Sequence, residues 1–114
     1  MEVLKEIAQT LANVKLKDIK IYDTRSITPL FDYVINATAT SHRQIRAVIE
    51  HLKKDSQEKN FKIKGVEGER GEIWLLVDLY DVLVNIFLNE ERDRYALDKL
   101  WADLPQYDFD ELAK

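Results

Sequence analysis

The longest apolar stretch of the chain runs from residue 72 to residue 88. It is apolar or aromatic almost throughout and rich in β-branched residues, but two carboxylates, Asp78 and Asp81, interrupt it near its middle. A single strand of this length would span roughly 50 Å, more than twice the usual length of a strand. The pattern therefore predicts two buried strands in an antiparallel hairpin, with Leu79 and Tyr80 at its tip.

Both faces of this predicted hairpin are largely apolar. Strand alternation places Trp74 and Leu76 on one face and Leu75 and Val77 on the other. A sheet with one face in water would carry a polar residue at every second position. We therefore expect each face to be covered by helices of the same chain, by a partner, or by both.

Apolar residues at helical spacing predict helices in three other regions. Residues 2–14 carry one apolar stripe and form a first amphipathic helix. Ser41 followed by Gln44 matches a capping box, which predicts that a second helix begins there and runs to about Lys59. Pro105 ends the third region, one or two short helices whose apolar stripe consists of Tyr95, Leu97, Leu100, Trp101 and Leu104.

Shorter apolar runs predict three further strands, over residues 19–22, 31–37 and 61–65. The elements then follow in the order helix, strand, strand, helix, strand, strand, strand, helix. This order indicates an α+β (α/β-like) fold with a mixed sheet of about five strands flanked by helices. We expect residues 1–114 to form one domain, in which residues 106–114 are an acidic tail.

The three glycines of the chain, Gly65, Gly68 and Gly71, crowd into the segment just before the hairpin. Their crowding predicts a loop that turns tightly. A phosphate-binding loop is a weaker interpretation, because no Gly-Lys-Ser/Thr sequence follows and the segment leads into a strand rather than a helix.

The composition narrows the class of protein and of partner. The chain has no cysteine, which excludes disulfides and thiolate metal sites, and its first residues lack the apolar core of a signal peptide or membrane span, so we expect it in the cytoplasm. Its 17 basic and 21 acidic residues give a net charge of −4, which argues against an affinity that comes mainly from neutralising phosphates. A basic protein partner is the better match, and we expect no sequence-specific binding of nucleic acid.

The end of the chain is acidic. Lys114 is the only basic residue after Lys99, and it is outnumbered by Asp103, Asp108, Asp110 and Glu111. The segment fits a docking patch for a basic partner and an ordinary solubilising surface about equally well.

Asp78 and Asp81, joined by Asp32 or Glu67, are the best catalytic candidates, as ligands of a divalent ion such as Mg²⁺ for phosphoryl transfer. Their i, i+3 spacing is wrong for one strand face, and across the mouth of a hairpin the two carboxylates would repel unless a cation joined them. Arg92 or Arg94 could supply that cation. Acids that stabilise the turn or bind a partner are the stronger interpretation.

The remaining candidate residues have ordinary structural explanations. His42 and His51 lie on different faces of the predicted middle helix, with no neighbouring nucleophile, and are expected to be exposed. Trp74 and Trp101 fit core positions, but the two-sided apolar hairpin favours an interface, where tryptophans tend to be anchors.

Four segments, in order along the chain, resemble the signatures of a known family. Through these segments the chain is similar to the ribosomal silencing factor family, also called the iojap family. Four ordered motifs in one small domain are a far more specific signal than any single motif. The resemblance extends from about Ile19 to Pro105, and the segments are residues 31–47, 65–69, 74–87 and 92–101.

The resemblance implies a translation repressor of bacteria and organelles, not an enzyme, and it implies no cofactor or metal. Members of this family bind the large ribosomal subunit through its protein number fourteen and block joining with the small subunit. Their fold is similar to that of nucleotidyltransferases. The residues expected to contact the basic ribosomal protein are Trp74, Asp78, Tyr80, Asp81, Arg92, Tyr95, Leu97, Leu100 and Trp101.

Two other functions stay open from the sequence. One is a nucleotidyltransferase-like enzyme that uses Asp78 and Asp81 with Mg²⁺. The other is a module that self-associates through the same apolar patch, and a homodimer of the free protein would not exclude ribosome binding.

Three residues depart from the family pattern. Ala39 stands where many members have glycine, Tyr80 where many have a small residue, and Asn85 where histidine is usual. Tyr80 bears most directly on binding, because a large side chain at the hairpin tip changes the surface offered to a partner.

Overall fold

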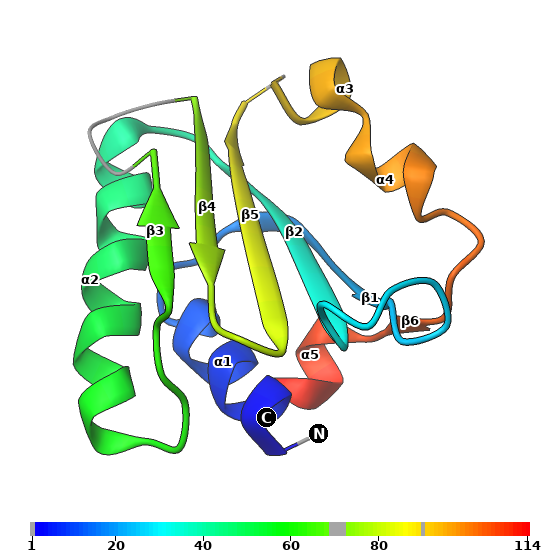
Figure 1. The fold of residues 1–114 in the computed structure, drawn as a ribbon. Helices are drawn as coiled ribbons and strands as arrows, with labels where there is room; N and C mark the ends of the chain where they lie inside the picture. The colour runs from blue at the N-terminus through cyan, green and yellow to red at the C-terminus, as the bar shows by residue number, and fades with distance from the viewer. Residues whose placement is uncertain (1, 69–72, 90) are drawn as a thin grey trace.

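The computed structural model describes residues 2–68, 73–89 and 91–114. These residues form a six-stranded sheet with helices on both sides (Figure 1). The predicted α+β fold with a mixed sheet is confirmed, with one strand more than the expected number of about five. In chain order the elements are α1 (Glu2–Ala12), β1 (Lys17–Asp23), β2 (Tyr33–Ala39), α2 (His42–Glu58), β3 (Gly65–Glu67), β4 (Trp74–Asp78), β5 (Val82–Leu88), α3 (Glu91–Tyr95), α4 (Leu97–Leu100), β6 (Gln106–Tyr107) and α5 (Phe109–Leu112).

The strands lie in the order β3-β4-β5-β2-β1-β6 across the sheet. The central strands β2 and β5 are parallel, paired from Tyr33 with Val82 to Ala39 with Leu88, and the other neighbouring strands are antiparallel. This register decides which side chains of distant segments share a face.

The predicted central hairpin is confirmed. β4 and β5 pair antiparallel, with Trp74 opposite Phe87 and Asp78 opposite Leu83. In the turn Tyr80 adopts a left-handed backbone conformation (φ 71°), and its N–H donates a 2.9 Å hydrogen bond to Asp78 Oδ1. This bond helps to stabilise a conformation that is costly for a residue other than glycine.

The main core lies between the sheet and helices α1 and α2. Ser41 caps α2 by accepting a hydrogen bond from the Gln44 N–H, as the capping box predicts, and Gln44 Oε1 accepts one from the Thr40 N–H. The hairpin residues Leu75 and Val77 face this core, so helices of the same chain cover one side of the hairpin. The buried stripes of the two helices are Leu4, Ile7 and Leu11 of α1 and Ile45, Val48, Ile49 and Leu52 of α2.

Residues 106–114 build two elements that the sequence pattern does not predict. β6 pairs with β1, and α5 follows at once, capped by the Asp108 side chain. Phe109 and Leu112 pack against the core. The acidic segment is therefore attached to the sheet, while Asp108, Asp110 and Glu111 stay exposed.

The strand predicted over residues 61–65 is wrong. The strand β3 begins at Gly65, where the predicted strand was expected to end. Phe61 is buried in the core instead, and pairing with β4 starts only where the Lys64 N–H donates a 2.7 Å hydrogen bond to the Asp78 carbonyl. Phe61 and Ile63 are apolar residues two positions apart, as in a strand, but they precede the residues that pair with β4.

The tight glycine loop is confirmed at one position only. Gly65 lies in β3 rather than in a loop. Gly68 has φ 85°, a conformation that favours glycine. Gly71 lies outside the described residues.

Candidate functional site

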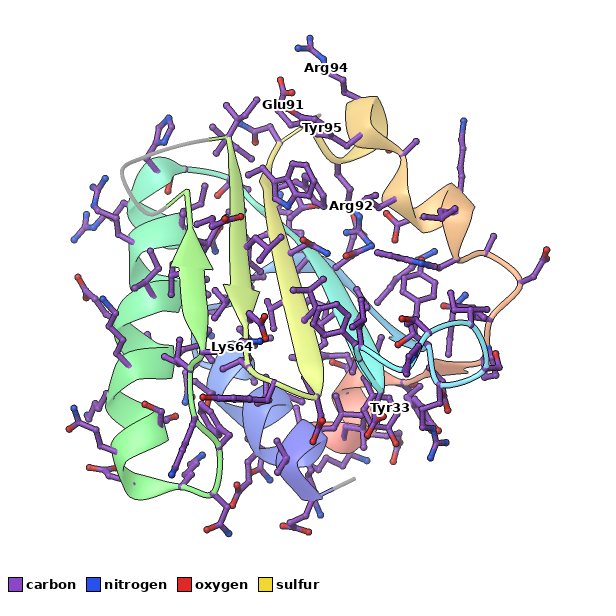
Figure 2. All side chains as sticks on the ribbon, in the orientation of Figure 1. Tyr33, Lys64, Glu91, Arg92, Arg94 and Tyr95 are labelled. Carbon is purple, nitrogen blue, oxygen red and sulfur yellow. The ribbon has the colours of Figure 1, made fainter. Side chains whose placement is uncertain are left out.

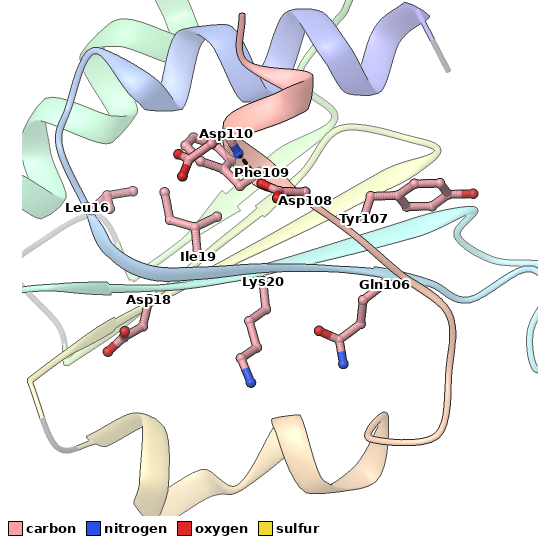
Figure 3. Close-up of a pocket in the computed structure, with 9 residues that line it drawn as sticks. All are labelled: Leu16, Asp18, Ile19, Lys20, Gln106, Tyr107, Asp108, Phe109 and Asp110. Carbon is pink, nitrogen blue, oxygen red and sulfur yellow. Dashed lines mark hydrogen bonds between the residues drawn. The ribbon is translucent and has the colours of Figure 1, made fainter.

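The second face of the hairpin looks away from α1 and α2. The short helices α3 and α4 lie on this side of the sheet, whereas α1 and α5 lie on the other side of β1 (Figure 3). We call this surface the α3–α4 face. The strand register places on it Trp74 and Leu76 of β4, Asn85 and Phe87 of β5, Asn36 and Thr38 of β2, and Lys20 and Tyr22 of β1.

Three aromatic rings form a cluster at the end of the hairpin nearest α3. The ring centroid of Trp74 lies 5.1 Å from that of Phe87 and 4.7 Å from that of Tyr95, and the latter two are 5.9 Å apart. Phe87 is fully buried, Trp74 is half-buried and Tyr95 is 41% exposed. We call these three residues the aromatic platform. Tilted and stacked ring pairs of this kind stabilise one another beyond the area they bury.

A chain of side-chain hydrogen bonds runs from the platform to α4. Trp74 Nε1 donates to Asn85 Oδ1 at 3.0 Å, and Asn85 Nδ2 donates to Asn36 Oδ1 at 3.1 Å. Asn36 Nδ2 then donates to Asp98 Oδ1 at 3.2 Å. The chain therefore crosses β4, β5 and β2 and ends on a carboxylate of α4.

At Asp98 this series of hydrogen bonds meets the side chain of Arg92 from α3. Arg92 donates to the Asp98 carboxylate from Nε at 2.7 Å and from Nη2 at 3.2 Å, and the Tyr22 hydroxyl donates at 2.6 Å. Arg92 is itself buried, and its Nη1 donates to Thr38 Oγ1 at 3.2 Å and to the Asp18 carbonyl. The two residues thus fasten α3 and α4 to β1 and β2. We call Arg92 and Asp98 the latch.

The environment of the latch changes the pKa of two groups. Burial on its own would raise the pKa of Asp98, but hydrogen bonds from Arg92, Tyr22 and Asn36, together with the Arg92 charge, lower it to about 2. Burial, followed by the hydrogen bond to the Asp98 carboxylate, raises the pKa of Tyr22 well above its usual range. Asp98 is therefore ionised and Tyr22 neutral throughout the physiological range.

The structure brings six of the nine predicted contact residues to the α3–α4 face. Trp74 and Tyr95 belong to the platform and Arg92 belongs to the latch. Figure 2 labels Tyr95 and Arg92 on the side of the sheet that carries α3 and α4. The rest of the group lies on or just after α4: Leu97 is half-buried, Leu100 is 71% exposed, and Trp101 packs on Tyr22 with ring centroids 5.9 Å apart.

The other three predicted contact residues, Asp78, Tyr80 and Asp81, lie at the hairpin tip, the opposite end of β4. At about 3.3 Å per residue, the Asp78 backbone is roughly 13 Å along the strand from Trp74. Tyr80 is 53% exposed, and a hollow of about 450 Å³ beside it is lined by Leu30, Phe31, Lys64, Asp78, Tyr80 and Asp81.

The prediction that Arg92 or Arg94 joins the two tip carboxylates is wrong. Arg92 pairs with Asp98, and Arg94 Nε lies 3.6 Å from Glu91 Oε2. Both arginines follow β5, which carries the chain to the end of the sheet away from the tip. The basic group near the tip is Lys64, whose Nζ lies 6.0 Å from the centroid of the Tyr80 ring.

Sequence analysis missed Tyr22, Asn36, Asn85 and Asp98 as parts of this site. Asn36 and Asn85 did carry a signal, because each is a polar residue near the middle of an apolar strand and needs a partner when buried. Their pairing became visible only with the parallel register of β2 and β5, which sets them opposite one another.

Metal-ligating side chains do not gather at one point in the described part of the chain. Residues 2–68, 73–89 and 91–114 contain no group of three or more His, Asp or Glu side chains placed to hold a metal ion. A groove of about 550 Å³ lies along β1 and α5 and is lined from both sides of the strand, so its polar groups do not converge (Figure 3). The same described residues contain no helix long and apolar enough to cross a membrane.

The whole chain matches a family model described as "Ribosomal silencing factor during starvation", over residues 1–114. The chain belongs to the ribosomal silencing factor family. The resemblance predicted from the four sequence segments is therefore confirmed. The family name describes a regulator of ribosomes rather than a catalyst of a reaction.

Individual members of the ribosomal silencing factor family agree with this assignment. The ribosomal silencing factor RsfS of Bacillus subtilis is 34% identical over 108 residues, which are 95% of this chain and 92% of that protein. The chloroplastic protein Iojap of Zea mays is 29% identical over 97 residues, 85% of this chain and 42% of the maize protein. A crystal structure of a Chromobacterium violaceum protein has a TM-score of 0.83 at 37% identity, covering 89% of this chain and 84% of that one.

Proposed function

We propose that this protein represses translation by binding the large ribosomal subunit through its protein number fourteen, which keeps the small subunit from joining. The proposal combines the family membership with the chemistry of the α3–α4 face. It places the protein in the cytoplasm, where such a repressor meets ribosomes. It requires no reaction, cofactor or metal.

The observation that carries the proposal is the aromatic platform. Trp74 and Tyr95 pack against each other in a tilted arrangement and stay partly exposed, and exposed Leu100 lies on the neighbouring helix. Tryptophan and tyrosine side chains fixed in this way are the usual anchors of protein interfaces. The latch keeps these residues ordered before a partner arrives, so that binding costs less conformational entropy.

The same surface carries both signs of charge, with Lys20 exposed on it and Arg94 exposed beside Asp93, and its acids offer contacts to a basic partner. Asp93 and Asp103 are exposed close in sequence to the platform and α4, and Asp78 and Asp81 form a second acidic point at the hairpin tip. Acidic groups around an apolar centre mainly speed association with a basic protein and restrict the choice of partner. The two ends of β4 would then contact different parts of one partner.

Steric exclusion is the mechanism. The molecule measures 35 × 34 × 25 Å. A rigid body of this size bound beside the face where the subunits meet would occupy space that the small subunit needs. A free homodimer through the platform would compete with this binding, because both would cover the same apolar residues.

Co-sedimentation with separated large and small subunits tests the proposal. We expect the protein to migrate with the large subunit only, and we expect Leu100→Ala to weaken binding. Ile27→Ala is the matched control, because Ile27 is an exposed aliphatic residue (57%) in the loop between β1 and β2, outside the platform. Equal binding to both subunits, or equal losses for the two variants, would contradict the proposal.

A further inference from the structure

Helix α2 has an exposed basic face that takes no part in the surface described above. Its apolar stripe is buried against the sheet. At about 100° per residue, a sector centred roughly opposite that stripe carries Arg43, Arg46 and Lys54, with Lys53 at its edge and Glu50 and Glu58 as its acids. All six side chains are exposed. We call this sector the basic face.

The basic face stands out because the protein as a whole is acidic, with a net charge of −4. The excess of acids lies elsewhere, including the segment around α5. Arg43, Arg46 and Lys54 form no ion pair with any residue in the described ranges. A helix surface that serves solubility alone usually interleaves opposite charges as i, i+4 pairs. On this face Arg46, Glu50 and Lys54 follow one another at i, i+4 spacing, but within the described residues no ion pair joins them, so two guanidinium groups are left for an external partner.

The basic surface continues beyond the helix. Gln44 Nε2 donates 3.0 Å hydrogen bonds to the carbonyls of Val14 and Lys15, which fixes the connector after α1 against the first turn of α2. The exposed Lys15 therefore lies near the Arg43 end of the face. From Arg43 to Lys54 the face spans roughly 16 Å at about 1.5 Å per residue, enough to follow several backbone phosphates.

We propose that the basic face of α2 contacts the phosphate backbone of ribosomal RNA when the protein is bound to the large subunit. The inference rests on the proposed function. α2 and the α3–α4 face lie on opposite sides of the sheet, so one molecule can hold a ribosomal protein with its platform and RNA with α2 (Figure 1). Two weak contacts on one rigid body reinforce each other through effective concentration.

The chemistry favours RNA over an acidic protein. Arginine forms bidentate, charge-assisted hydrogen bonds with phosphate. A protein interface would also need an apolar or aromatic anchor. In the described part of the chain the large exposed apolar residues are Ile27, Leu30, Ile73, Tyr80, Tyr95 and Leu100, and none of them lies on α2.

A negative net charge does not exclude a local contact with phosphates. An acidic total argues against a protein whose affinity comes mainly from phosphates, and the platform remains the main anchor here. It does not argue against a local group of bases that adds a smaller, sequence-independent contribution.

The test measures binding to the large subunit as a function of KCl concentration, between about 50 and 200 mM. The variant is Arg43→Gln combined with Arg46→Gln, two exposed positions that leave the buried stripe intact. Lys5→Gln combined with Lys114→Gln is the control, because it removes the same charge from exposed positions outside α2. Circular dichroism and the melting temperature check that both variants fold.

We expect the α2 variant to bind roughly tenfold more weakly at low salt, and its plot of log affinity against log salt to lose about two units of slope, one for each phosphate contact. The control should match the wild type. An unchanged affinity, or a weaker affinity with an unchanged slope, overturns the inference. Failure of the wild type to bind at all overturns the proposed function and this inference together, so the two failures are distinguishable.

Discussion

Replacing Asp98 by Asn tests whether the latch holds α3 and α4 in place. The change removes the charge that Arg92 faces but keeps the size of the side chain. Asp98 has a pKa of about 2 instead of its ordinary 3.8. At about 1.36 kcal/mol for each pKa unit, this difference corresponds to about 2.4 kcal/mol of stability at neutral pH. Arg92 would also stay buried without its partner, so we expect a loss of about 2 to 3 kcal/mol.

The pH dependence has a definite sign. Because the pKa of Asp98 is lower in the folded protein than in the unfolded chain, its contribution is fully present above about pH 4 and disappears as the pH falls toward 2. The wild type and Asp98→Asn should therefore differ at pH 7 and converge near pH 2. Urea unfolding followed by tryptophan fluorescence at several pH values measures this difference.

Asp103→Asn is the control, since Asp103 is exposed in the same part of the chain. It should unfold like the wild type at every pH. The reasoning fails if Asp98→Asn is within about 0.5 kcal/mol of the wild type at pH 7, the usual range for surface substitutions. It also fails if the difference between the two proteins persists unchanged at pH 2.

Three further substitutions probe other parts of the molecule. Trp74→Ala should weaken binding to the large subunit by about 2 kcal/mol, roughly thirtyfold, whereas Trp74→Phe should lose less; an unchanged affinity of the folded fraction would assign Trp74 to the core. Asp78→Asn should slow association at low salt more than at high salt in stopped-flow measurements, and equal effects would exclude electrostatic steering by this group. Asp23→Asn should cost only about 1 kcal/mol in urea unfolding, because the hydrogen bonds of Arg25 that lower the pKa of Asp23 to about 2 come from an exposed, salt-screened side chain; a loss as large as that of Asp98→Asn would contradict this.

The parts of the fold that could be predicted from sequence are those with a local periodic signal. The hairpin, the Ser41 cap and the apolar stripe of α2 depend on residues close together in the chain, and all three are confirmed. β6 and α5 escaped prediction because they are two and four residues long. The strand over residues 61–65 failed because alternation shows where apolar side chains fall and not whether a neighbouring strand is present.

In the candidate site, too, residues with a local sequence signal could be predicted and contacts between distant residues could not. Trp74 and Tyr95 carried a recognisable signal as aromatic residues in apolar segments. The bonds that connect the latch to the sheet did not, because Asp98 bonds to Tyr22, which is 76 residues away, and the pairing of Asn36 with Asn85 joins residues 49 positions apart. Only the order and register of the strands bring these partners together. The basic face of α2 was hidden for a different reason, since a net charge averages over surfaces that the fold keeps apart.

A subunit-joining assay tests the central claim most directly. Purified large and small subunits are mixed with increasing amounts of the protein, and joined ribosomes are measured by light scattering. The account predicts a dose-dependent loss of joined ribosomes that requires the protein to bind the large subunit, with Trp74→Ala much less effective and Ile27→Ala equal to the wild type. Normal joining at concentrations that saturate the large subunit would contradict the account, because a bound protein that leaves the joining surface open cannot act by steric exclusion.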